Sequence, residues 1–176
     1  MSKDWRISTF NGVLLACYFI PSWTISAMKI WISPIRGFYD RSNIAAALYA
    51  SDYLSLPAIG TIRLAWMLAL CKITVAAFFL LFLLMVIRAA IRNKGGADEA
   101  LAFALGLGAF FSMASLIAAS KVAEMAALRL HASESLLLIG AAILLIIETN
   151  PDTERKSETA ASRVPHHGYL SSSPNS

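Results

Sequence analysis

The chain has 176 residues, of which 57% are hydrophobic and 15% are charged, and its formal net charge is +4. Soluble globular domains average about 45–50% apolar and about 25% charged residues, so this composition excludes an ordinary soluble domain. The basic residues are scattered and mostly flank apolar runs, which is typical of membrane orientation signals and argues against a nucleic-acid partner.

A helix of about 20 residues crosses the hydrocarbon core of a bilayer, which is about 30 Å thick. We predict an all-α membrane protein with four transmembrane helices, a short interfacial helix between the first two, and a disordered C-terminal tail. The expected spans are about 8–31, 64–88, 100–120 and 128–148, and the interfacial helix is about 43–55. The domain boundaries are 1–6 for the N-terminal segment, 7–148 for the transmembrane domain and 149–176 for the tail.

The first apolar run follows Lys3 and Arg6, as in a secretory signal sequence, and its LLAC stretch ends at Cys17 like a loose lipoprotein cleavage box. The hydrophobic run continues well past Cys17, and no A-x-A site follows it. We therefore expect a retained first span with a kink at Pro21. Because Cys17 and Cys71 both lie in apolar runs, we expect them to be small buried packing residues rather than ligands or disulfide partners.

The connection after the first span is broken by Pro34 and Gly37, and Asp40 or Ser42 can cap the short helix that follows. That helix lacks the apolar length to span, so we place it at the membrane interface. All four Trp and four of the five Tyr lie within the first 66 residues. This distribution favours an aromatic belt at the headgroup level over a quinone or haem pocket.

The second apolar run, LAWMLALCKITVAAFFLLFLLMVI, contains one lysine, Lys72. If the hydrocarbon core covers residues 64–87, Lys72 is embedded at a cost of about 2.5–3.5 kcal/mol on insertion scales, and Trp66 lies at the interface. If the core begins at Ile73, the charged end of Lys72 reaches the headgroups. We favour the embedded position, in which the lysine needs a partner or a watery cavity.

The third run is rich in small residues, and Ala104, Gly108 and Ser112 stand four residues apart on one helical face. Such spacing permits close helix packing, so this face is the candidate for packing within the chain or in a homo-oligomer. The end of the run is ambiguous because no Gly, Pro or Asn follows. A turn near Lys121 would start the fourth span at about residue 126, whereas a turn near Ser133, which we favour, would use that serine as a cap.

The candidate polar path consists of Lys72 with three ionisable residues near the fourth span, Glu124, His131 and Glu134. With the turn near residue 121, Glu134 lies at almost the same depth as Lys72, which predicts a Lys72–Glu134 pair. With the favoured turn near residue 133, the glutamates and the histidine form an ordinary solvated end of the bundle.

The polar, Ser-rich segment after Glu148 cannot bury enough apolar surface to become ordered, and its adjacent His166 and His167 are not expected to bind a metal. Basic residues flank the first span, the NKGG loop and the tail. The positive-inside rule therefore places both termini in the cytoplasm, although the first loop carries arginines of its own.

No catalytic, cofactor-binding or metal-binding motif occurs in the sequence. We expect an accessory, assembly or scaffolding protein of a bacterial-type inner membrane, in contact with lipids and with other subunits or copies of itself. The first alternative is a transporter or proton-coupled channel that uses the candidate polar path. The second alternative is a lipid-modifying membrane enzyme.

Overall fold

The computed structural model describes residues 6–32, 41–88 and 96–149, and these form five α-helices without strands. In chain order they are α1 (Ile7–Ile32), α3 (Arg41–Tyr53), α4 (Ala58–Ile87), α6 (Gly96–Val122) and α7 (Met125–Thr149). All but α3 are long and apolar enough to cross a membrane. The prediction of an all-α membrane protein with four long helices and one short helix is confirmed, while the expected tail from residue 150 onward lies outside the described residues.

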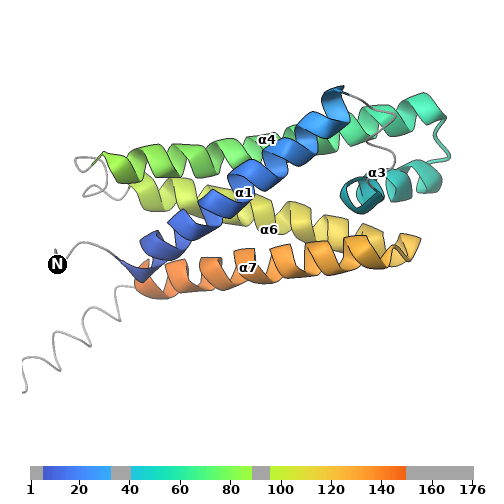
Figure 1. Ribbon diagram of the computed structural model, residues 1–176. Helices are drawn as coiled ribbons and strands as arrows, with labels where there is room; N and C mark the ends of the chain where they lie inside the picture. The colour runs from blue at the N-terminus through green and yellow to red at the C-terminus, as the bar shows by residue number, and fades with distance from the viewer. Residues whose placement is uncertain (1–5, 33–40, 89–95, 150–176) are drawn as a thin grey trace, which may run out of the picture.

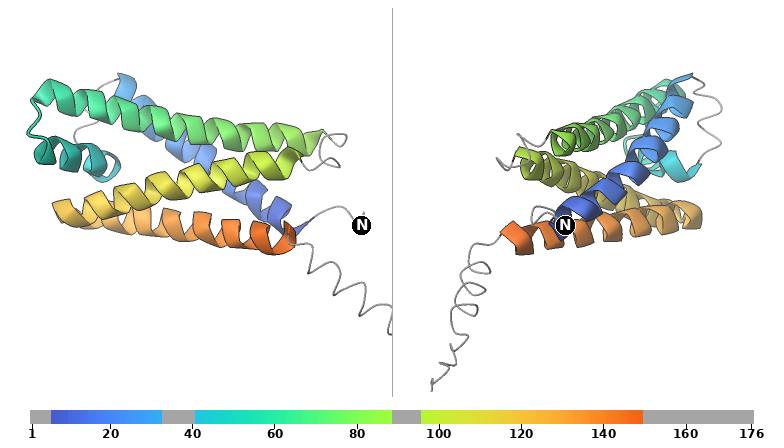
Figure 2. Two further views of the ribbon diagram at one scale, coloured as in Figure 1. Left: turned by 180° about the vertical axis from the view of Figure 1, so that it is seen from behind. Right: turned by 60° about the vertical axis from the view of Figure 1, so that its left-hand side comes forward.

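The long helices form an elongated bundle in which α1 crosses the others obliquely (Figure 1). It begins beside the end of α7 and finishes against the first half of α4, as both views in Figure 2 show. The short helix α3 packs against α4, α6 and α7. We call the end of the bundle where α1 begins and α7 finishes the terminal end, and the end that holds α3 the far end.

Small residues line many of the helix contacts, and many of the large aliphatic residues face outward. Ala16, Ala69 and Ala104 are fully buried, whereas Leu136 and Ile146 are 74% and 65% exposed. This inversion of a soluble core is expected in lipid, because helices associate there through close packing and hydrogen bonds rather than through burial of apolar surface. The exposed aliphatic surface therefore suits contact with acyl chains.

The turn between the third and fourth spans lies at Ala123 and Glu124, so the favoured turn near Ser133 was wrong. Ala123 adopts a positive φ of 55°, and the amide of Glu124 donates to the carbonyl oxygen of Ala119 at 3.2 Å. This is the hydrogen-bond pattern of a Schellman helix end. Ser133 lies inside α7 and donates to the carbonyl oxygen of Leu130 at 2.8 Å. The turn was missed because its left-handed residue is alanine instead of glycine or asparagine.

The α3–α4 turn is built in the same way. Ser55 has a φ of 50°, and the amide of Leu56 donates to the carbonyl oxygen of Ser51 at 2.9 Å. The helix α4 then begins at Ala58, directly after Pro57. In the first span, where we predicted a kink at Pro21, the helix α1 runs without interruption from Ile7 to Ile32. Cys17, which was expected to be buried, is exposed on the surface of this helix.

Apolar side chains fill the terminal half of the bundle. The rings of Phe19 on α1 and Phe79 on α4 stack at a centroid distance of 5.7 Å, and Phe82, Leu101 and Leu138 are at most 1% exposed. We call this core the apolar layer; its buried members are Leu15, Ala16, Phe19, Trp23, Val75, Phe79, Phe82, Val86, Ala97, Ala100, Leu101, Ala104, Leu105, Leu138, Ala141 and Leu145.

Candidate functional site: a buried polar layer

The carboxylate of Glu134 on α7 lies at the centre of a buried polar group and is 4% exposed. The indole nitrogen of Trp23, from α1, donates to its Oε1 at 2.8 Å. On the other oxygen, Oε2, the hydroxyl of Ser112 from α6 donates at 3.4 Å and Nδ1 of His131 lies at 2.9 Å. One side chain therefore joins α1, α6 and α7.

His131 extends this group to the short helix. It stands three residues before Glu134, so the two side chains lie on the same face of α7 one turn apart. Its Nε2 lies 3.1 Å from the backbone carbonyl oxygen of Ser42 at the start of α3, and its side chain is 2% exposed. The imidazole ring thus bridges α7 and α3.

Lys72 on α4 is directed into the bundle and is 3% exposed. Its Nζ donates to Oδ1 of Asn43 on α3 at 2.7 Å, and Asn43 directly follows Ser42, whose carbonyl oxygen lies 3.1 Å from Nε2 of His131. The ammonium group is therefore held by the protein, as the embedded position requires, and does not extend along the outer surface. A direct Lys72–Glu134 ion pair remains a prediction.

All five helices contribute to this group, which we call the polar layer: Trp23, Ser42, Asn43, Lys72, Ser112, His131 and Glu134. The structure brings together Lys72, His131 and Glu134 of the predicted polar path. The fourth member, Glu124, lies apart in the α6–α7 turn and is half-buried. The placement of the turn decides this arrangement, because α7 must begin before His131 for the histidine to face α3.

The sequence did not reveal the partners of these charges. Trp23 had been assigned to an aromatic belt, yet it is 2% exposed. Asn43 stands near the start of α3, and the sequence pattern predicted no role for it. Ser112 was identified only as a small packing residue. The sequence did contain one usable signal: each span carries a polar side chain within its apolar run, and such residues tend to face one another inside a bundle.

The small-residue face of the third span packs inside the chain. Ala104 and Ser112 are 0% and 2% exposed, and a Cβ added at Gly108 would lie 3.2 Å from Leu138 and 3.4 Å from Val75. The face therefore supports the contacts of α6 with α7 and α4. It is not available to hold a homo-oligomer together.

Apolar packing separates the polar layer from the terminal end. On each long helix, the members of the apolar layer other than Trp23 lie between the polar-layer residue and the terminal end. At that end Arg6 pairs with Asp98 at 2.7 Å and with Glu148 at 3.5 Å. From the terminal end to the far end, the bundle thus contains the ion pairs of Arg6, then the apolar layer, then the polar layer.

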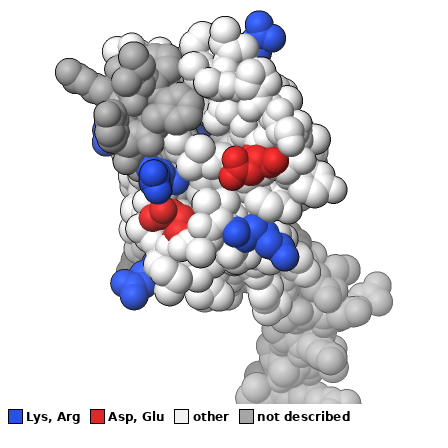
Figure 3. Space-filling view, turned by 90° about the vertical axis from the view of Figure 1, so that its right-hand side faces the viewer, with Lys and Arg blue, Asp and Glu red and all other residues white. Residues whose placement is uncertain are grey.

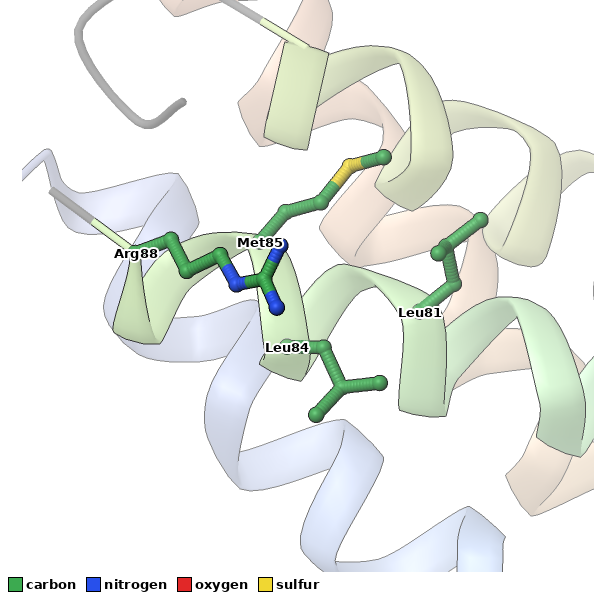
Figure 4. A pocket seen from close by; sticks show the side chains of 4 residues that line it. All are labelled: Leu81, Leu84, Met85 and Arg88. Atoms are coloured by element: carbon green, nitrogen blue, oxygen red, sulfur yellow. The ribbon is translucent and has the colours of Figure 1, made fainter. Parts of the chain in front are cut away.

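Among the described residues, the surface of the far end shows no gathering of charge of one sign. Figure 3 looks onto the far end, where basic and acidic side chains are interspersed with other residues and do not gather by sign. Near the terminal end, a recess of about 200 Å³ is lined by Leu81, Leu84 and Met85 of α4 and by Arg88, which directly follows this helix (Figure 4). It lies in the terminal half of α4, apart from the polar layer.

Within the described ranges, no three His, Cys, Asp or Glu residues gather as they would to hold a metal ion. Comparison of the chain with protein-family models, curated proteins and solved structures finds no match.

Proposed function

We propose that this chain is a small bacterial-type inner-membrane protein that acts as an accessory, assembly or scaffolding component. The observation that carries the proposal is the apolar layer. Phe19, Phe79 and Phe82 are 0% exposed and fill the interior between the polar layer and the terminal end. A conduit through one chain would need polar groups or water across that distance, since an ion gains nothing from apolar walls.

The polar layer fits a structural task. Its hydrogen bonds connect helices that otherwise pack through apolar side chains, and such bonds are worth about 0.6 kcal/mol on average in membranes. Several of them acting together favour one arrangement of five helices. A component that presents a fixed surface to partners or copies of itself needs such rigidity.

Association must use a surface other than the small-residue face, because that face is occupied within the chain. The outward surface of α6 carries Phe103, Phe110 and Ile117, which are 62%, 66% and 56% exposed. These side chains suit either lipid tails or an apolar partner helix.

The test is purification of the full chain in mild detergent, followed by measurement of the mass of the complex. A stable complex with other membrane proteins, or a homo-oligomer that carries no proton flux in vesicles, supports the proposal. A homo-oligomer that conducts protons would overturn it in favour of transport.

Transport or proton-coupled permeation through an oligomer is the second candidate, and the burial of Lys72, His131 and Glu134 favours it. Ionisable residues inside spans commonly mark ion and proton pathways. If the chain transports protons, proteoliposomes that contain a pH-sensitive dye should show a proton flux. Lys72→Met and Glu134→Gln should abolish this flux, and Glu124→Gln should preserve it. Equal flux in all of these variants and in empty vesicles would exclude it.

For orientation we propose that both termini face the cytoplasm. The ion pairs of Arg6 with Asp98 and Glu148 lie where α1 begins, α6 begins and α7 ends, so the first and last spans start and finish on the same side of the bundle, as an even number of spans requires. Reporter fusions at each terminus that are active only in the cytoplasm test this. Activity at neither terminus would reverse the orientation.

A further inference from the structure

The contacts of His131 fix the number of protons that it shares with Glu134. Nε2 faces the backbone carbonyl oxygen of Ser42 at 3.1 Å, and a carbonyl oxygen can only accept a hydrogen bond. Nε2 must therefore carry a proton. This leaves Nδ1, which lies 2.9 Å from Oε2 of Glu134, as the atom whose state depends on the carboxyl group.

The contact between Nδ1 and Oε2 also needs a proton between its two atoms. If the carboxyl group is ionised, Nδ1 must be the donor; if the carboxyl group is protonated, Oε2–H donates to Nδ1. Without that proton, the lone pair of Nδ1 would face a carboxylate at 2.9 Å. In both permitted forms the pair holds two protons and has no net charge.

We propose that His131 and Glu134 form a proton-binding site, in which one proton lies between Nδ1 and Oε2 and is released to water or a buffer base as the pH rises. No bond other than N–H or O–H changes, and the pair passes from a net charge of zero to minus one. The site is the same whether the chain serves as an accessory protein or as a transporter.

Loss of the proton is coupled to helix packing. The single remaining proton can stay on Nε2, in which case the contact with Glu134 becomes repulsive. It can instead move to Nδ1, in which case the contact with Ser42 becomes repulsive. Either outcome weakens one of the two bonds by which the His131 ring links Glu134 to α3, so proton release should loosen α3.

The neighbours of the pair come from every other helix. Lys72 from α4 is the charged neighbour in the polar layer; its Nζ donates to Oδ1 of Asn43 at 2.7 Å, and it is 3% exposed. The remaining contacts come from Trp23 on α1, Ser42 on α3 and Ser112 on α6. Trp23 and Ser112 both donate to the carboxylate and stabilise its ionised form.

The test counts the protons directly. In the full chain carrying His166→Gln and His167→Gln, His131 is the only histidine left, so selective nitrogen-15 histidine labelling gives one ring. Nitrogen NMR reports the ring protons, and infrared spectroscopy reports protonated carboxyl groups. At neutral pH we expect either two ring protons with an ionised Glu134, or one at Nε2 with a protonated Glu134. Finding one ring proton together with an ionised Glu134 would overturn the proposal.

Glu134→Gln provides the matched variant. Its Oε1 can still accept from Trp23, and its amide can donate to Nδ1, so the ring keeps one proton on Nε2 and the neutral-to-alkaline titration step should be lost. Glu124→Gln, in the nearby turn, should titrate like the parent. An unchanged titration in Glu134→Gln contradicts the shared site. If Glu134→Gln does not fold, the number of protons on His131 and Glu134 in the parent chain still tests the proposal.

Discussion

Trp23 on α1 donates its indole N–H to the carboxylate of Glu134 on α7, at 2.8 Å and across 111 positions of the chain. Both side chains are buried, at 2% and 4% exposure. The helix α1 begins beside the end of α7 and crosses toward α4 (Figure 1). The Trp23–Glu134 bond is therefore a polar contact between two helices that also meet at the terminal end, where Glu148 accepts from the amides of Ile7 and Ser8.

Trp23→Phe should lower the free energy of unfolding by about 1 kcal/mol, because it removes this donor and keeps an aromatic ring. Unfolding by SDS in mixed micelles, followed by circular dichroism, gives the measurement. The matched control is Trp66→Phe, since Trp66 is 44% exposed and should be neutral. Equal losses in both variants would show that the indole bond contributes nothing specific.

Gly108→Leu should destabilise the bundle by about 1–3 kcal/mol through overpacking. A Cβ at this position already lies 3.2 Å from Leu138, whereas a Cβ at Gly106 on the same helix meets nothing within 4 Å. Gly106→Leu is thus the control, and it should leave stability unchanged or slightly raised because leucine favours helix. Thermal unfolding in detergent compares the two, and a tolerated Gly108→Leu would speak against the α6–α7 contact.

Ala123→Gly should raise the free energy of unfolding by about 0.5–1 kcal/mol, because glycine adopts a positive φ without the steric penalty of a Cβ. The value of φ at Ala123 is 55°. In contrast, Ala132→Gly within α7 should cost about 1 kcal/mol. A turn near Ser133 would remove the reason for a gain at Ala123, so a loss of stability there would challenge the observed turn.

Glu148→Gln should lower stability by about 0.5–1 kcal/mol at low salt, and less at high salt. Its carboxylate accepts the backbone amides of Ile7 and Ser8, each at 3.1 Å, and therefore caps the first turn of α1 from a different helix. Glu99→Gln at the start of α6 is the control, because Glu99 is exposed. Unfolding measured at two salt concentrations should show the larger difference for Glu148, because an exposed first-turn carboxylate such as Glu99 interacts only with the dipole of its own helix.

The sequence by itself determined the class of the protein and the number of its spans. Apolar runs long enough to cross a bilayer can form only helices there, because each backbone polar group must be satisfied within the run. Local composition therefore sufficed to place the four long helices and the short one. It also sufficed to mark Lys72, Glu124, His131 and Glu134 as unusual.

Only the tertiary structure decided which of these residues meet. The turn at Ala123 and Glu124 has no sequence signal, because its left-handed residue is an alanine. Helix packing offsets the steric cost of the positive φ at this alanine. Once α7 begins at Met125, His131 and Glu134 face inward instead of forming a solvated end, and α3 supplies Ser42 and Asn43. Such partners come from helices far apart in the chain, so spacing along the sequence carries no record of them.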